Sequence, residues 1–139
     1  MDENTFDPLM AAIDAAAGVD VLGLHPAALL DRLDGLETAK RRLEAVQAVT
    51  ICEIDTQDLA SAAGFRTTAA LLLFRLGWSP RTARARVRTA DATTPVHSPT
   101  GTPTPAPYPR LAALMSTGTA SGEQAPSRRR RRPGRADRW

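Results

Sequence analysis

The chain has 139 residues, of which 42% are hydrophobic and 4% aromatic, and its formal net charge is +3. This length predicts one domain, whose core must consist mainly of Ala, Leu and Val because aromatic residues are scarce. The single cysteine, Cys52, excludes an intrachain disulfide and a zinc site built from several cysteines.

The N-terminus is acidic and polar, without the basic and apolar segments of a signal peptide. The sequence contains no apolar run close to the ~20 residues that a membrane span needs. We therefore expect a cytoplasmic protein that has no membrane partner.

The N-terminal third predicts two helices joined by a short connector. The first helix is expected to begin after Asp7-Pro8 and to end near Gly18. Its apolar residues recur at helical spacing: Phe6, Leu9, Met10 and Ile13. Pro26 begins a second helix. A long helix from Asp34 to about Thr56 either continues it or starts anew, with Asp34 and Glu37 as a pair that resembles a capping box.

The long helix carries two apolar faces. The first is a stripe made of Leu36, Ala39, Leu43, Val46, Thr50 and Ile54. The second lies near the C-terminal end and consists of Ala45, Ala48 and Cys52, which indicates that the helix lies between neighbours there. Glu44 is expected to lie off the first stripe. Cys52 is interpreted as a small core residue and not a nucleophile, because no histidine is close in sequence.

Residues 64–90 predict two helices joined by a tight corner. The segment from Thr67 to Leu76 is apolar nearly all round, which is typical of a helix buried in a bundle. Gly77 ends this helix, and Ser79-Pro80 begins the next with an N-cap and a first-turn proline. The second helix places three small or branched residues on one side: Ala83, Val87 and Ala90. Its other side carries three arginines: Arg81, Arg84 and Arg88.

The remaining segments differ in character. Six prolines between residues 93 and 109 exclude a helix or a central strand and predict an extended connector. Residues 110–115 form a brief helical patch, and residues 120–124 resemble the start of another helix. From Ala125 the sequence has no apolar periodicity and predicts disorder.

We therefore expect an all-α fold, a bundle of four to six helices. Its helical domain covers residues 1–92. A Pro/Thr-rich connector follows at 93–109, then a truncated helical segment at 110–124 and a disordered basic tail at 125–139.

The order of these elements resembles the domain of unknown function 222, also called the 13E12 repeat family, of high-GC actinobacteria. The resemblance covers about residues 20–124. It is carried by the helix start Gly64–Leu71, by Gly77–Pro80 with the apolar side of the next helix, by the proline-rich crossover, and by Gly118, Ser121 and Glu123-Gln124. In that family the domain usually precedes an HNH endonuclease module.

The resemblance implies that a helix with an apolar stripe should continue after Glu123-Gln124. Here an arginine-rich sequence follows instead. One hypothesis is that the reading frame was lost near residue 125, which would leave a truncated remnant without nuclease activity. The alternative is a basic tail that binds nucleic acid.

The sequence offers no catalytic constellation. An HNH nuclease needs a histidine that activates water and further His, Asp or Asn ligands for a divalent metal. The chain has only His25 and His97, whose spacing suggests no metal site. No phosphate-loop or dinucleotide motif is present. We expect no catalytic residue, no metal, no cofactor and no small-molecule ligand, and therefore not an enzyme.

The alternative function is that of a small DNA-binding protein. Residues 1–60 hold twelve acids and four bases, a balance of −8, whereas residues 61–139 hold fourteen arginines and three acids, a balance of +11. An arginine face after a tight corner resembles the recognition helix of a helix-turn-helix. The candidate residues are Arg81, Arg84, Arg88, Arg128, Arg129, Arg130, Arg131 and Arg132. The competing interpretation is a solvated face that forms ion pairs with the acidic half.

Overall fold

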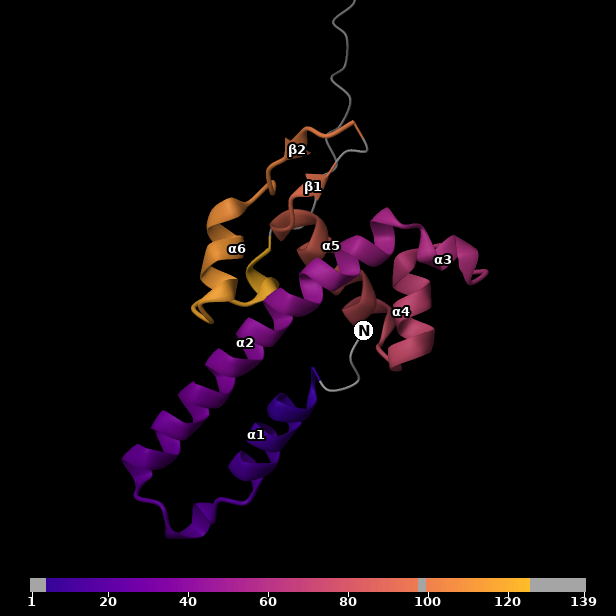
Figure 1. Ribbon diagram of the computed structural model, residues 1–139. Coiled ribbons are helices and arrows are strands. Elements are labelled where there is room, and N and C mark those ends of the chain that lie inside the picture. The colour runs from indigo at the N-terminus through magenta and orange to yellow at the C-terminus, as the bar shows by residue number, and fades with distance from the viewer. Residues whose placement is uncertain (1–4, 98–99, 126–139) are drawn as a thin grey trace, which may run out of the picture. The chain divides into compact units, whose positions relative to one another are not determined.

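The computed structural model describes residues 5–97 and 100–125 (Figure 1). In these ranges the secondary structure is almost entirely helical, which confirms the all-α prediction. The elements are α1 (Asp7–Ala17), η1 (Val21–Gly23), α2 (Pro26–Thr56), α3 (Leu59–Ala62), α4 (Thr68–Leu76), α5 (Pro80–Thr93), β1 (Val96–His97), β2 (Pro103–Thr104), α6 (Pro109–Ser116) and η2 (Gly122–Gln124). The chain divides into two compact units, Met1–Leu36 and Glu37–Trp139, and the boundary lies inside α2.

The first unit is a helical hairpin, in which α1 and the start of α2 run in opposite directions (Figure 1). The Asp20 side chain caps η1 by accepting a hydrogen bond from the Leu22 amide at 3.0 Å. The Arg32 guanidinium donates to the Ala16 carbonyl oxygen at 2.6 Å and so links the two helices. No residue from 5 to 36 is buried.

α2 is one continuous helix of 31 residues, so the capping-box prediction is wrong. Asp34 lies in the helix interior, where the backbone amides that follow it already have partners four residues back. Glu37 instead forms ion pairs with Lys40 at 3.0 Å and Arg41 at 3.2 Å. These pairs lower the pKa of Glu37, the hydrogen bond from Lys40 being the main cause.

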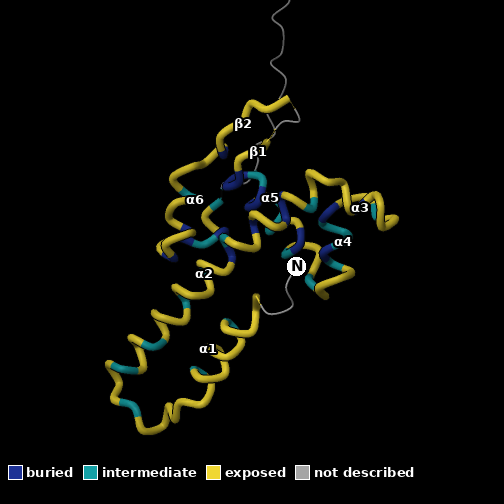
Figure 2. The backbone as a smooth tube through the Cα atoms, in the orientation of Figure 1, coloured by how far each residue is buried: buried dark blue, intermediate teal, exposed yellow. Residues whose placement is uncertain are grey.

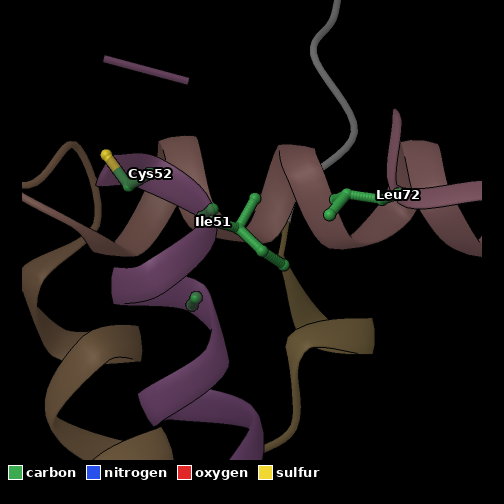
Figure 3. Packing of buried hydrophobic residues seen from close by; sticks show 5 residues of the cluster. Ile51, Cys52 and Leu72 are labelled. Atoms are coloured by element: carbon green, nitrogen blue, oxygen red, sulfur yellow. The ribbon is translucent and has the colours of Figure 1, made fainter. Parts of the chain in front are cut away.

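The buried face of α2 is the second apolar face and not the first stripe. Its buried residues are Glu44, Ala48, Ile51 and Cys52. Leu36, Leu43 and Val46 of the first stripe stay exposed. Ala90 of α5 is fully buried and packs in the same cluster as Ala48, Ile51, Cys52 and Leu72 (Figure 3). Ala48, Cys52 and Ala90 are small, so helices that pack at this cluster can approach closely. The second apolar face of α2 is therefore the one that becomes buried.

α4 is less buried than its composition predicts. Only Thr68 and Leu72 are buried, whereas Phe74 is 75% exposed, so the expectation of burial on all sides is wrong. A helix of nine residues that packs on one side against α5 leaves its other side to solvent (Figure 2). The Phe74 ring retains one neighbour, the Phe65 ring, with centroids 5.4 Å apart.

The end of α4 and the start of α5 are as predicted. Gly77 ends α4 with φ +68°, a conformation that glycine adopts without strain. α4 itself begins one residue later than predicted, because Thr67 is its N-cap and accepts a hydrogen bond from the Ala70 amide at 3.1 Å. Ser79 caps α5 through the Thr82 amide at 3.1 Å. The apolar side of α5 is buried at Ala83 and Ala90.

The segments after α5 are short. The proline-rich connector is extended and forms one two-residue antiparallel ladder, with Val96 opposite Thr104. α6 covers the predicted helical patch and buries Met115 completely. Residues 122–124 form a single turn of 3-10 helix. Apart from Ala125, the tail predicted to be disordered lies outside the described residues.

Candidate nucleic-acid interface

The candidate interface begins at the corner between α4 and α5. Three residues, Gly77 to Ser79, separate the two helices, which pack against each other. A turn of this length with glycine is typical of a helix-turn-helix. The serine cap and Pro80 fix where α5 begins and therefore which residues its first turns present.

The three predicted arginines lie on one exposed side of α5. At 100° per residue, Arg81, Arg84 and Arg88 fall within about 60° of one another, and all three are exposed. In the part of the chain that the structure describes, the ion pairs involve other cations and none of these three. Arg81 also lies in the first turn of α5, where the helix dipole is positive and the turn itself contains no acidic residue.

A fourth arginine of α5, Arg86, interacts with other residues of the fold. Its guanidinium pairs with Glu44 of α2 and lies over the Trp78 ring, 5.9 Å from the centroid. The Glu44 side chain is only 9% exposed. The sequence analysis missed this pair. The sequence did indicate the burial of Glu44, though not its partner, because Glu44 is four and eight residues before Ala48 and Cys52 and so shares their buried face.

Gly122 completes this cluster from the C-terminal side. Its amide donates to Glu44 Oε2 at 3.1 Å, and its carbonyl oxygen accepts a hydrogen bond from Thr89 Oγ1 at 3.2 Å. A Cβ at this position would lie 2.8 Å from Thr89 Cγ2 and 3.3 Å from Glu44 Oε1. Only glycine therefore fits, and η2 is held against α5 and α2.

A pocket of about 430 Å³ opens beside this cluster. Its lining comes from α2, α5 and the C-terminal segment: Glu44, Arg81, Thr82, Ala85, Arg86, Arg88, Thr89, Gly122, Glu123 and Ala125. The structure thus brings Arg81 and Arg88 to one pocket, while Arg84 lies outside the lining. The candidates Arg128–Arg132 lie outside the described residues. In sequence, only two residues separate Ala125 from Arg128.

The charged groups of this interface suit binding better than proton transfer. Guanidinium groups remain protonated at every physiological pH, so an arginine cannot act as a general base. The Glu44 carboxylate already accepts hydrogen bonds from Arg86 and Gly122. The pocket therefore combines the guanidinium groups of Arg81, Arg86 and Arg88 with the carboxylates of Glu44 and Glu123, and of these Glu44 is already paired with Arg86.

Elsewhere the titratable residues are dispersed. His25 Nδ1 accepts a hydrogen bond from the Ala27 amide at 3.3 Å, and His97 is exposed on β1. Within residues 5–97 and 100–125, no group of three or more His, Cys, Asp and Glu side chains is placed to hold a metal ion.

None of the helices in these ranges combines the length and the apolar character needed to cross a lipid bilayer.

The fold and site define an all-α domain in which an exposed basic helix follows a helix-turn-helix corner. A family described as a domain of unknown function, DUF222, matches residues 30–130, and the chain belongs to this family. Comparison with curated proteins and comparison with solved structures each found no match.

Proposed function

We propose that this chain is a non-catalytic helical module that binds the phosphate backbone of double-stranded DNA through α5. The observation that carries the proposal is the arginine face, Arg81, Arg84 and Arg88, exposed on one side of α5 directly after the corner. Phosphate contacts by arginine supply most of the sequence-independent affinity of DNA-binding proteins.

The geometry of α5 supports this role. Its 14 residues span about 21 Å, and a recognition helix contacts DNA with its N-terminal residues. Arg81 and Arg84 lie in the first two turns, where the backbone amides and the helix dipole add positive potential. Arg81 and Arg88 share the pocket with the Thr82 hydroxyl, which accepts a hydrogen bond from Ser79 and keeps its own proton to donate, so a backbone phosphate seated there would find both charge and a hydrogen-bond donor.

The proposal assigns no catalysis to this chain. In the relatives that the resemblance implies, an HNH module follows the helical domain, and we propose that cutting belongs to that module. A direct test incubates supercoiled plasmid with the protein at about 10 µM and Mg²⁺ or Mn²⁺. We expect no nicked product, and metal-dependent nicking that co-purifies with the protein would contradict a non-catalytic role.

The binding test compares two triple variants with the same change in charge. One replaces Arg81, Arg84 and Arg88 by alanine, and the matched control replaces the exposed Arg66, Arg75 and Arg110. Affinity for a fluorescent 20-base-pair duplex, a length of about two helical turns, is measured by anisotropy over a salt series. Three phosphate contacts add about 2.7 to the slope of log K against log salt, which is about 40-fold between roughly 50 and 200 mM salt.

We expect the α5 variant to lose this part of the slope and the control variant to keep it. A third protein, with Arg128–Arg132 replaced by serine, measures what the tail contributes. If that protein no longer binds DNA while the α5 variant binds normally, the tail alone is responsible. Such a result would favour a truncated remnant without a DNA-binding function of its own.

A further inference from the structure

The N-terminal hairpin, residues 5–36, exposes an apolar row on each of its helices. On α1 and its N-cap the row is Phe6, Met10 and Ile13, which are 67%, 53% and 47% exposed. On α2 it is Leu29, Leu33 and Leu36, which are 40%, 62% and 48% exposed. An amphipathic helix is stable in a globular protein when its apolar stripe is covered, and here no residue of the hairpin is buried.

The two rows have the same spacing. Each places its residues over two helical turns, at i, i+4 and i+7, so that they fall within about 60° of one another. Rows of this spacing interdigitate in antiparallel helical bundles. Because α1 and α2 run in opposite directions, a two-fold axis would set the α1 row of one hairpin against the α2 row of another.

The exposed area matches what a dimer needs. If a fully exposed large apolar residue offers ~180 Å², the six side chains offer roughly 570 Å² of apolar surface. A standard interface buries about 800 Å² per partner, of which about 65% is apolar in homodimers, or roughly 520 Å². The segments outside the described residues are no substitute, because MDEN and the arginine-rich tail contain no apolar row.

We propose that the hairpin is a self-association surface: two copies of this chain pair their hairpins into a four-helix bundle whose core is the six row residues and their partners. This inference rests on the apolar rows and does not depend on DNA binding. The dimer would contain two α5 helices, because each copy of the chain has one.

Charge distinguishes this dimer from another way of joining two copies. The hairpin carries five aspartates and one arginine, a balance of −4, and the aspartates lie off the two rows. Pairing two hairpins brings like charges together, so salt should strengthen the dimer by screening. An acidic hairpin that docked on the arginine face of another copy would instead separate as salt rises.

The experiment is sedimentation equilibrium of the full chain without DNA, over about 1 to 100 µM protein and a salt series. The test variant is M10Q/L33Q, with one change in each row, and the control is L22Q. Leu22 is 94% exposed but lies in η1, outside both rows. Circular dichroism checks that each variant keeps its helices.

We expect a wild-type dimer that tightens or stays constant as salt rises. M10Q/L33Q should weaken it at least about 100-fold, because every change counts twice in a symmetric interface, and L22Q should leave it unchanged. A wild-type monomer throughout this range would overturn the proposal. A dimer that salt dissociates would overturn it as well, as would equal weakening by both variants or by neither.

Discussion

At the scale of single residues, the fold depends on a few side chains whose neighbours are unusual for their chemistry. Glu44 is a carboxylate on a core face, Gly122 fits where no Cβ can, and Cys52 is a thiol packed between helices. The interpretation of Cys52 as a core residue is confirmed by its burial. The same burial determines how readily the Cys52 thiol reacts.

Cys52 should react slowly with thiol reagents, and it should make the free energy of unfolding depend on pH in the alkaline range. Burial raises the pKa of its thiol above the usual 9.0 and outweighs a hydrogen bond with Thr56 that lowers it, while nearby carboxylates, chiefly that of Asp91, add to the rise. Because the pKa is higher in the folded state, the contribution to stability is complete below pH 9 and declines as pH rises through the folded value. Urea unfolding at several pH values measures the decline.

The control for this prediction is Cys52→Ala, which should remove the part of the alkaline decline that belongs to the thiol. Labelling with a thiol reagent should also be slow in the native protein and rapid in urea. Native labelling as fast as that of the unfolded chain would show that the thiol is accessible.

At the scale of elements, the Glu44–Arg86 ion pair joins α2 to α5 and holds η2 through Gly122. Removing one partner of a buried pair leaves an uncompensated charge. The two partners are unequal, because the Glu44 side chain is 9% exposed and that of Arg86 is 27% exposed. The carboxylate therefore depends more strongly on its partner.

Arg86→Met should lower the free energy of unfolding by about 3 kcal/mol, because it leaves the Glu44 charge buried with only the Gly122 amide as a partner. Adding Glu44→Gln removes that charge and should restore part of the loss. Urea unfolding of the wild type, both single variants and the double variant gives the coupling free energy. A coupling near zero would mean that the pair contributes nothing to stability.

At the scale of the whole molecule, burial is distributed unequally between the two units. All buried residues of the described chain lie from Glu44 onward, and residues 5–36 contribute none. A unit without a buried core opens locally at little cost in free energy. The hairpin is therefore expected to be the least protected part of the fold.

Hydrogen exchange followed by mass spectrometry should show this difference. In dilute protein, amides of α1 should exchange much faster than amides in the core of α5, which has five buried residues. If two hairpins pair, protection of α1 should increase with protein concentration while that of α5 stays constant. Equal protection of α1 and α5 in dilute protein would contradict the unequal stability of the two units.

The sequence by itself determined most of the helices and the corner between α4 and α5, because these depend on local chemistry. Serine before proline begins α5, glycine in the left-handed region ends α4, and three arginines at helical spacing share a face whatever the tertiary structure. The family resemblance was also visible in the sequence and is confirmed by the match over residues 30–130.

Only the tertiary structure decided which surfaces are covered. α2 has two apolar faces, and the choice between them depends on the small residues that α5 offers as a neighbour. The Glu44–Arg86 pair joins residues 42 positions apart, which no local pattern specifies. Periodicity shows that a face is apolar, but burial requires a partner surface. Within its own unit, each of the hairpin rows stays exposed, and Phe74 of α4 stays 75% exposed with the Phe65 ring as its aromatic neighbour.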